Sequence, residues 1–200
     1  MTTMRPTQAR SLLQAAFSDS TNILSAFLAE DRNIDAIERF VDFSVGALGS
    51  TGRVFACGNG GSMSDAMHFT EELAGRSRNH RPALPAITFS DPATLTCIAN
   101  DYGYASVFSR QVEAQAKRGD VLVLLSTSGN SPNLIEAAKT AQGLGVTTVG
   151  LLGRGGGKLL PEVTVPILVP LAETSDRIQE VQMLVLHVVT EAIEQRLFKS

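Results

Sequence analysis

The sequence predicts an α/β fold, a three-layer α/β/α sandwich around a central five-stranded parallel sheet, preceded by two N-terminal helices. From about residue 53 onward, short apolar runs alternate with helical patterns. Such alternation is typical of a parallel sheet with right-handed crossovers. The clearest run, at residues 121–125, is continuous, apolar and short, as buried parallel strands are.

The chain of 200 residues suits one domain, which we expect to span residues 1–200. Within it we expect N-terminal helices at about 8–48, an α/β core at about 53–170 and a C-terminal helix at about 176–198. Hydrophobic residues make up 44% of the chain, enough for a sizeable core, and the 18% of charged residues argues against disorder. The low charge also suggests that other subunits cover part of the surface.

Charge and cysteine content restrict the classes of function. The formal net charge of −3 provides no basic field that would attract nucleic acid or a membrane surface. Cys57 and Cys97 form no C-x-x-C pair, which is typical of a reduced cytosol. The first ten residues lack the apolar core of a signal peptide, and no apolar run approaches the ~20 residues of a membrane span. We therefore expect a cytoplasmic protein without nucleic-acid or membrane partners.

Two amphipathic helices are expected before the first strand, at residues 8–29 and 33–48. Apolar residues recur in them at helical spacing: Leu12, Leu13, Ala16, Phe17, Ile23, Leu24, Phe27 and Leu28, then Ile34, Ile37, Phe40, Val41, Val45 and Leu48. Asp31 or Asn33 is a candidate N-cap of the second helix. Because no strand precedes these helices, we expect them to pack both on the later sheet and on a neighbouring subunit.

The chain is organised around residues 53–75, where an apolar run predicts a buried strand and the glycines at 58–61 permit close backbone approach. Ser62 is a candidate N-cap of the next helix, with Asp65 completing a capping-box pattern. A strand, a glycine turn and a helix start direct free backbone N–H groups at an anion. A plain tight turn is the alternative, because no lysine follows the glycines and Met63 replaces the third glycine of a dinucleotide fingerprint.

The remaining elements follow in alternation. Further strands are expected at residues 86–89, 121–125, 146–152 and 163–169. Helices are expected at residues 92–99, 104–117 and 132–144, with a turn at 100–103 and a flexible loop at 154–157. A long helix over residues 176–198 closes the chain, with Asp176 as its N-cap and Gln179 at the capping-box position.

A second loop, Ser126–Ser131, places four hydroxyl groups between a strand end and a helix start. Hydroxyls and backbone N–H groups there can surround phosphate oxygens without a lysine. The alternative is a generic Ser/Thr turn that caps the helix. Since open parallel sheets bind ligands outside the carboxyl ends of their strands, two such loops in one sheet favour a phosphate site.

His68 and Glu72 are at positions i and i+4, so they project from one helix face. They belong to a polar stripe of Asp65, His68, Glu72 and Arg76, opposite the apolar residues Ala66, Met67, Phe69, Leu73 and Ala74. The alternative is a solvated helix face with an ordinary His–Glu pair.

In the last helix, His187 lies off the expected apolar stripe, which runs through Ile178, Val181, Leu184, Val185, Val188 and Ala192. The alternative for His187 is a core histidine satisfied by a backbone carbonyl. Gln179 precedes His187 by eight residues, ~12 Å along a helix. One metal ion with bonds of ~2 Å could barely reach both from one chain. If Gln179 and His187 both serve one kind of site, the spacing predicts a site shared between subunits.

Five motifs in register resemble the phosphoheptose isomerase family of the sugar-isomerase (SIS) domain superfamily. They are CGNGGS at 57–62, DAMHFTEELAGR at 65–76, AND at 99–101, STSGNS at 126–131 and DRIQE at 176–180. The resemblance runs from about residue 10 to the C-terminus. It implies the SIS fold, a homotetramer with active sites between subunits, and zinc at the ligand positions His68, Glu72, Gln179 and His187.

The resemblance also implies conversion of sedoheptulose 7-phosphate to D-glycero-D-manno-heptose 7-phosphate, a step towards bacterial heptose and products such as lipopolysaccharide. The implied substrate-binding residues are Asn59, Gly60, Gly61, Ser62, Glu72, Asn100, Asp101, Ser126, Thr127, Ser128, Ser131 and Gln179. Moving a carbonyl between C2 and C1 requires a base at C1 and an acid at the carbonyl oxygen. We expect Glu72 as the base and His187 as the acid/base partner. Zinc would polarise the carbonyl or orient the substrate.

A non-catalytic SIS-domain binding protein is the alternative function, either a replication-initiator-associating protein or a sugar-phosphate-sensing regulator. The presence of both Glu72 and His187 favours the enzyme.

Overall fold

The computed structural model describes residues 6–170 and 172–198, and its strands form one parallel sheet. The strand order is β2-β1-β3-β4-β5. The strands are β1 (Val54–Gly58), β2 (Ala86–Thr88), β3 (Val121–Ser126), β4 (Thr147–Leu152) and β5 (Val165–Leu168). The predicted five-stranded parallel sheet is confirmed. The ends of the expected domain, residues 1–5 and 199–200, lie outside the described residues.

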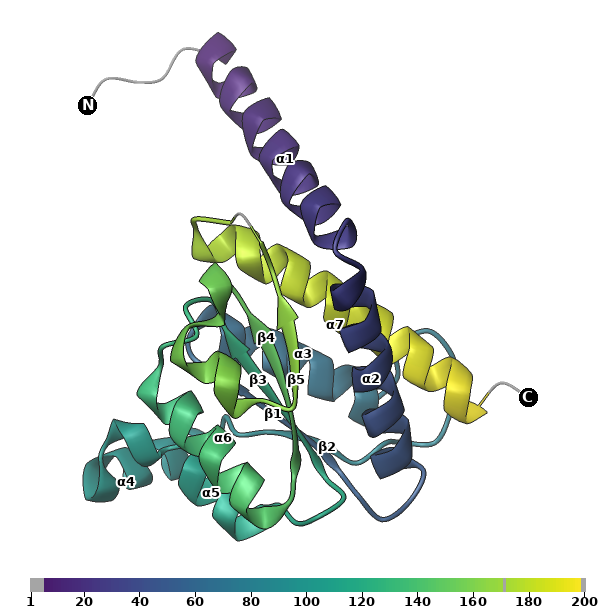
Figure 1. Ribbon diagram of the computed structural model, residues 1–200, viewed down its shortest axis with the longest axis vertical. Coiled ribbons are helices and arrows are strands. Elements are labelled where there is room, and N and C mark those ends of the chain that lie inside the picture. Colours follow the sequence, from purple (N-terminus) through teal and green to yellow (C-terminus); the bar gives the residue numbers. More distant parts are fainter. Residues whose placement is uncertain (1–5, 171, 199–200) are drawn as a thin grey trace.

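Helices cover both faces of this sheet (Figure 1). They are α1 (Pro6–Leu28), α2 (Asp31–Leu48), α3 (Gly61–Ala74), α4 (Pro92–Tyr102), α5 (Ser109–Gln115), α6 (Pro132–Leu144) and α7 (Ser175–Phe198), with the 3₁₀ segments η1 (Tyr104–Ser106) and η2 (Arg154–Glu162). Successive side chains of a strand point to opposite faces. In β1, Val54 and Ala56 join a core with α1, α2, α3 and α7, whereas Phe55 and Cys57 join a second core with α5 and α6. The two cores define the three layers.

Three of the expected elements differ from the sequence prediction. Helix α4 continues to Tyr102 and ends at Gly103, whose φ is +82°, so Asn100 and Asp101 lie in its last turn. The helix expected at 104–117 is divided into η1 and α5, with the fully buried Val107 and Phe108 between them. The flexible loop expected at 154–157 belongs to η2, whose three glycines all have positive φ.

Two of the predicted N-caps are wrong because the helices begin at other residues. Helix α2 begins at Asp31, and Asn33 is buried inside it. The Asn33 side chain donates to the Phe27 carbonyl and accepts from the Leu168 amide, so it joins α1, α2 and β5. Helix α7 begins at Ser175, which places Asp176 in its first turn.

The two ends of α1 differ in burial. Ile23 and Phe27, near its C-terminal end, are buried, whereas Leu12, Leu13 and Phe17 are 57%, 58% and 76% exposed. Figure 1 shows why: the N-terminal part of α1 extends away from the body of the molecule. Packing of α1 on the rest of the chain, which is chiefly on α2 and α7, is therefore confined to its second half.

The expected apolar stripe of α7 is wrong in part, because this helix carries apolar residues around most of its circumference. Leu184 and Val188 are 42% and 47% exposed, while Leu186, Val189 and Ile193 are buried. Among the described residues, none of the helices combines the length and the apolar character needed to cross a membrane.

Candidate active site

The strand order brings together the two loops predicted to bind phosphate, the glycine loop at residues 58–61 and the serine loop at residues 126–131. β2 lies on one side of β1 and β3 on the other, so the winding of the sheet reverses between β1 and β3. Gly58, at the end of β1, pairs with Leu125 near the end of β3. The glycine loop after β1 and the serine loop Ser126–Ser131 therefore leave the sheet side by side. Such a switch point is where open α/β sheets bind ligands.

A cavity of about 50 Å³ lies between the two loops. Its lining residues are Asn59, Ser62, Leu125, Ser126, Thr127, Ser128 and Ser131. Helices α3 and α6 both begin at this cavity, so the positive ends of their dipoles favour an anion there. Since a cavity needs only ~10–15 Å³ to hold one water, there is room here for a compact anionic group.

The glycine loop starts helix α3 earlier than the sequence pattern indicates. Gly60, with φ +58°, is the N-cap, and the predicted capping box of Ser62 and Asp65 is wrong. Ser62 is instead buried, and its hydroxyl accepts a hydrogen bond from the Gln179 amide of α7 over 3.3 Å. A Cβ on Gly61 would lie 2.5 Å from Gln179 Nε2, so the glycine permits the close approach of α7.

The serine loop is held in place by its own contacts. Ser126 Oγ accepts from the Gly129 amide over 2.9 Å, and the hydroxyls of Thr127 and Ser175 lie 3.2 Å apart. Gly129 has φ +63°, and a Cβ there would lie only 1.9 Å from the Gly156 carbonyl oxygen. The loop therefore packs directly against η2 and is arranged before any ligand arrives.

Two residues missed by the sequence analysis fix Asn59 at the edge of the cavity. The buried Asn133 exchanges two hydrogen bonds with it, of 3.0 and 2.8 Å, and the Tyr104 hydroxyl donates to Asn59 Oδ1 over 2.9 Å. Asn133 directly follows the Ser131-Pro132 pair that begins α6, which was the available sequence signal. Because Asn59 Oδ1 accepts two bonds and Nδ2 donates one of its two hydrogens, the amide has a defined orientation towards the cavity.

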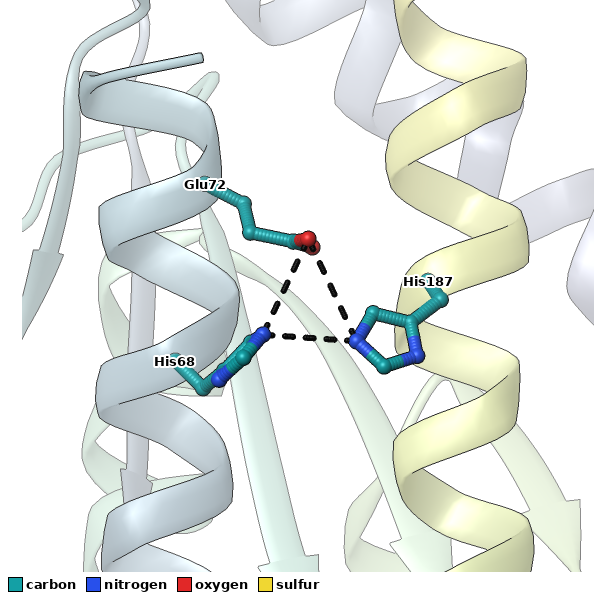
Figure 2. Close-up of side chains that lie close together, drawn as sticks. All are labelled: His68, Glu72 and His187. Atoms are coloured by element: carbon teal, nitrogen blue, oxygen red, sulfur yellow. Dashed lines mark hydrogen bonds and ion pairs between the residues drawn. The ribbon is translucent and has the colours of Figure 1, made fainter. Parts of the chain in front are cut away.

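Helices α3 and α7 bring three predicted residues together, as Figure 2 shows. His68 Nε2 lies 3.3 Å from His187 Nε2, and Glu72 Oε1 lies 3.7 Å from His68 Nε2 and 4.0 Å from His187 Nε2. The His187 side chain is 44% exposed, so the core-histidine alternative is wrong. The solvated-face alternative does not describe Glu72, which is only 14% exposed, although His68 is 49% exposed.

The geometry of this cluster fits a divalent cation. One nitrogen from each histidine and one oxygen of Glu72 lie within 4.8 Å of one another. Ligands of a tetrahedral zinc ion with bonds of ~2.0–2.1 Å are separated by ~3.3 Å, close to the distances found here. In addition, Glu72 Oε2 is buried and has no hydrogen-bond partner among the described residues. Buried carboxylate oxygens normally have a partner, and an ion is one explanation for the exception.

Other predicted residues lie outside this cluster. Gln179 reaches the glycine loop through Ser62. Asn100 donates to Asp101 Oδ1 over 2.8 Å at the exposed end of α4, and no hydrogen bond between described residues joins either of them to the cluster. The role of Gln179 as a zinc ligand and the roles of Asn100 and Asp101 towards substrate stay predictions.

The polar stripe of α3 is partly buried. Burial raises the pKa of the Asp65 carboxyl, and the nearby His68 only partly offsets this effect. Phe69 and Leu73 form the buried face as expected, but Met67 is 48% exposed and Ala74 is also exposed, contrary to the prediction. The buried face is therefore narrower than the sequence pattern indicates.

Fold and site together define a SIS-domain protein, and the SIS domain family matches residues 17–153. A phosphoheptose isomerase of Cytophaga hutchinsonii is 46% identical over 187 residues, which cover 94% of this chain and 98% of that protein. The chain belongs to the phosphoheptose isomerase family and is a sugar-phosphate isomerase.

Solved structures agree with this assignment. The phosphoheptose isomerase of Neisseria gonorrhoeae is 35% identical, with a TM-score of 0.87, over 94% of this chain and 99% of that chain. The enzyme of Francisella tularensis is 31% identical, also with a TM-score of 0.87, over 94% and 98% of the two chains. Membership of an enzyme family favours catalysis over the non-catalytic binding protein considered as the alternative.

Proposed function

We propose that the protein converts D-sedoheptulose 7-phosphate to D-glycero-D-manno-heptose 7-phosphate through an enediol, in the cytoplasm and as a step of heptose biosynthesis. The observation that carries this proposal is the approach of Glu72 and His187, from two separate helices, at 4.0 Å. A base and a second acid/base group at this separation can flank two adjacent carbons of a sugar.

The distance between cavity and cluster suits a heptose phosphate. His68 follows Ser62 by six residues, ~9 Å along α3, and the Glu72 carboxylate reaches back to within 3.7 Å of His68 Nε2. The six C–C bonds of a heptose, at ~1.5 Å each, span at most ~9 Å. A substrate whose phosphate occupies the cavity can therefore extend its C1 end towards Glu72.

In the proposed reaction Glu72 removes a proton from C1 of the ketose, and His187 donates a proton to the carbonyl oxygen on C2. The resulting enediol carries a C1–C2 double bond. Return of a proton to C2 and loss of the O1 proton then give the aldose, so that atoms and charge balance. The serine and glycine loops hold the phosphate throughout and keep C1 and C2 in place.

The residues that would hold a zinc ion are His68, Glu72 and His187. Gln179 of the same chain bonds Ser62 instead, so the proposed fourth ligand would be Gln179 of a neighbouring subunit. When bound, such an ion supplies polarisation of the substrate carbonyl. Coordination lowers the basicity of a carboxylate and occupies an imidazole nitrogen. Comparing the turnover rate with and without the metal therefore distinguishes the role of Glu72 and His187 as metal ligands from their role in proton transfer.

We also propose a homotetramer, because a large apolar surface is exposed on one chain. Its members on α1 and α7 include Leu12, Leu13, Phe17, Leu184 and Val188. Leu184 and Val188 also line an apolar groove of about 370 Å³ between α1, α2 and α7. Apolar surfaces of this kind mark protein–protein contacts. In such an assembly Asn100 and Asp101, exposed at the end of α4, are available to the active site of a neighbouring subunit.

The direct test is conversion of sedoheptulose 7-phosphate by the purified protein, followed by NMR. We expect formation of the aldoheptose 7-phosphate, with slower or no turnover of ketose phosphates of five or six carbons, whose C1 lies closer to the phosphate. Chelation followed by re-addition of zinc should lower and then restore the rate if the metal takes part. Failure to convert any ketose phosphate, with or without zinc, would contradict the proposal.

A further inference from the structure

A buried ion pair holds the end of α3 just beyond the proposed catalytic carboxylate. Arg81 Nε donates to Glu194 Oε1 of α7 over 2.9 Å, and the two side chains are only 2% and 4% exposed. The Arg81 guanidinium also donates to the carbonyl oxygens of Glu72 (2.6 Å) and Leu73 (2.7 Å). Carbonyls in the last turn of a helix lack partners within the helix, and a cation is favourable there. Arg81 therefore fixes the turn that carries Glu72.

Glu194 orders the segment that follows α3. Its carboxylate accepts from the backbone amides of Ser77 over 3.2 Å and Arg78 over 3.3 Å. Burial alone would raise the pKa of Glu194, but the Ser77 amide, the Arg81 side chain and the Arg78 amide together bring it below its usual value. Glu194 is therefore a carboxylate at neutral pH.

The ordered segment returns to the active site through a side chain. The Ser77 hydroxyl donates to Glu72 Oε1 over 3.3 Å, and Oε1 is the oxygen that faces His68 and His187. Glu194 itself follows His187 on α7 by seven residues, two helical turns or ~10.5 Å, so the two side chains lie on the same side of the helix. These contacts therefore connect α7, the helix that carries His187, to the Glu72 carboxylate.

We propose that Arg81 and Glu194, acting through Ser77, are positioning residues that hold the Glu72 carboxylate against His187 for proton transfer. A buried ion pair contributes little net stability compared with apolar residues of the same size, so stability alone does not account for it. Correct placement of a proton-transfer group does account for the ion pair, because small displacements of such a group slow the reaction strongly. The inference rests on the proposed role of Glu72 as the base.

The first test is Ser77→Ala, which removes the hydroxyl bond to Glu72 and leaves the Ser77 amide on Glu194. We expect kcat for the heptulose phosphate to fall about tenfold, the lower end for residues that orient a reactive group. KM should stay within about twofold, because the phosphate cavity lies at the opposite end of α3. The melting temperature should not change, because Ser77 is only half-buried at the surface.

The second test replaces Arg81 with lysine, which retains the charge but lacks the planar fork needed to reach Glu194 and two carbonyls together. We expect a fall in kcat larger than that of Ser77→Ala, again with little change in KM. Glu191→Gln is the matched control. Its partly exposed ion pair with Arg78 joins the same helix to the same segment over 2.9 Å. Among the described residues, the polar partners of Glu191 are Arg78 and Gln195 and not Glu72. This variant should keep the wild-type kcat.

Wild-type kcat in Ser77→Ala would overturn the inference, and so would equal losses in Ser77→Ala and Glu191→Gln. If Arg81→Lys does not fold, Ser77→Ala decides the question. Glu72→Gln in the same assay separates the two proposals. An inactive Glu72→Gln together with a fully active Ser77→Ala would reject the positioning role alone, whereas an active Glu72→Gln would reject Glu72 as the base.

Discussion

Glu72→Gln is expected to reduce kcat for sedoheptulose 7-phosphate by about 10⁴-fold, the upper end of the usual contribution of a general base. Glutamine has the same size and can still accept from the Ser77 hydroxyl, but it cannot take a proton from C1. The phosphate cavity is formed by other residues, so inhibition by inorganic phosphate should be unchanged. Initial rates followed by NMR and an inhibition constant for phosphate measure the two effects.

Glu71→Gln is the matched control for this change. Glu71 is the neighbouring carboxylate on α3 and is exposed, so its replacement should leave kcat and KM at their wild-type values. A Glu72→Gln protein that turns over at nearly the wild-type rate would show that the base is another residue.

His187→Gln is expected to slow turnover by about 10² to 10⁴, the range typical of general acid or base groups. Glutamine can donate a hydrogen bond to the carbonyl oxygen but cannot transfer a proton at neutral pH. Because His187 is 44% exposed and outside both hydrophobic cores, the subunit assembly and melting temperature should be unchanged. Rates and size-exclusion elution of the two proteins measure these expectations.

The chain contains three histidines, and His80 serves as the control because it is exposed and lies in the segment after α3. His80→Gln should retain full activity. If His187→Gln also keeps full activity, the acid/base assignment is wrong. If it loses its assembly along with its activity, the loss of rate is structural.

The sheet and its two loops could be predicted because their signals are local. Continuous apolar runs at β1 and β3 are each followed at once by glycines or hydroxyls, and the order of strands along the chain limits the ways in which they pair. The cap residues were less predictable, since Gly60 begins α3 before Ser62 can cap it. Glycine allows several backbone conformations, so a run of glycines in the sequence does not fix where the following helix starts.

The cluster of His68, Glu72 and His187 was predictable in its members but not in its geometry. His68 and Glu72 share a helix face by spacing alone, whereas the approach of His187 depends on how α7 packs across α3. The contact of Arg81 with Glu194 joins residues 113 positions apart, and no local pattern indicates it. The faces of α7 were also ambiguous, because apolar residues occur on more than one side of it.

The most direct test of the enediol chemistry at Glu72 is isomerisation of sedoheptulose 7-phosphate by the wild-type enzyme in D₂O. The proton that Glu72 takes from C1 can exchange with solvent before a proton returns to C2, so we expect deuterium at C2 of the heptose 7-phosphate. NMR and mass spectrometry of the product measure its content. Product formed at full rate with no deuterium at C2 would indicate a hydride shift and would contradict the role of Glu72 as the base.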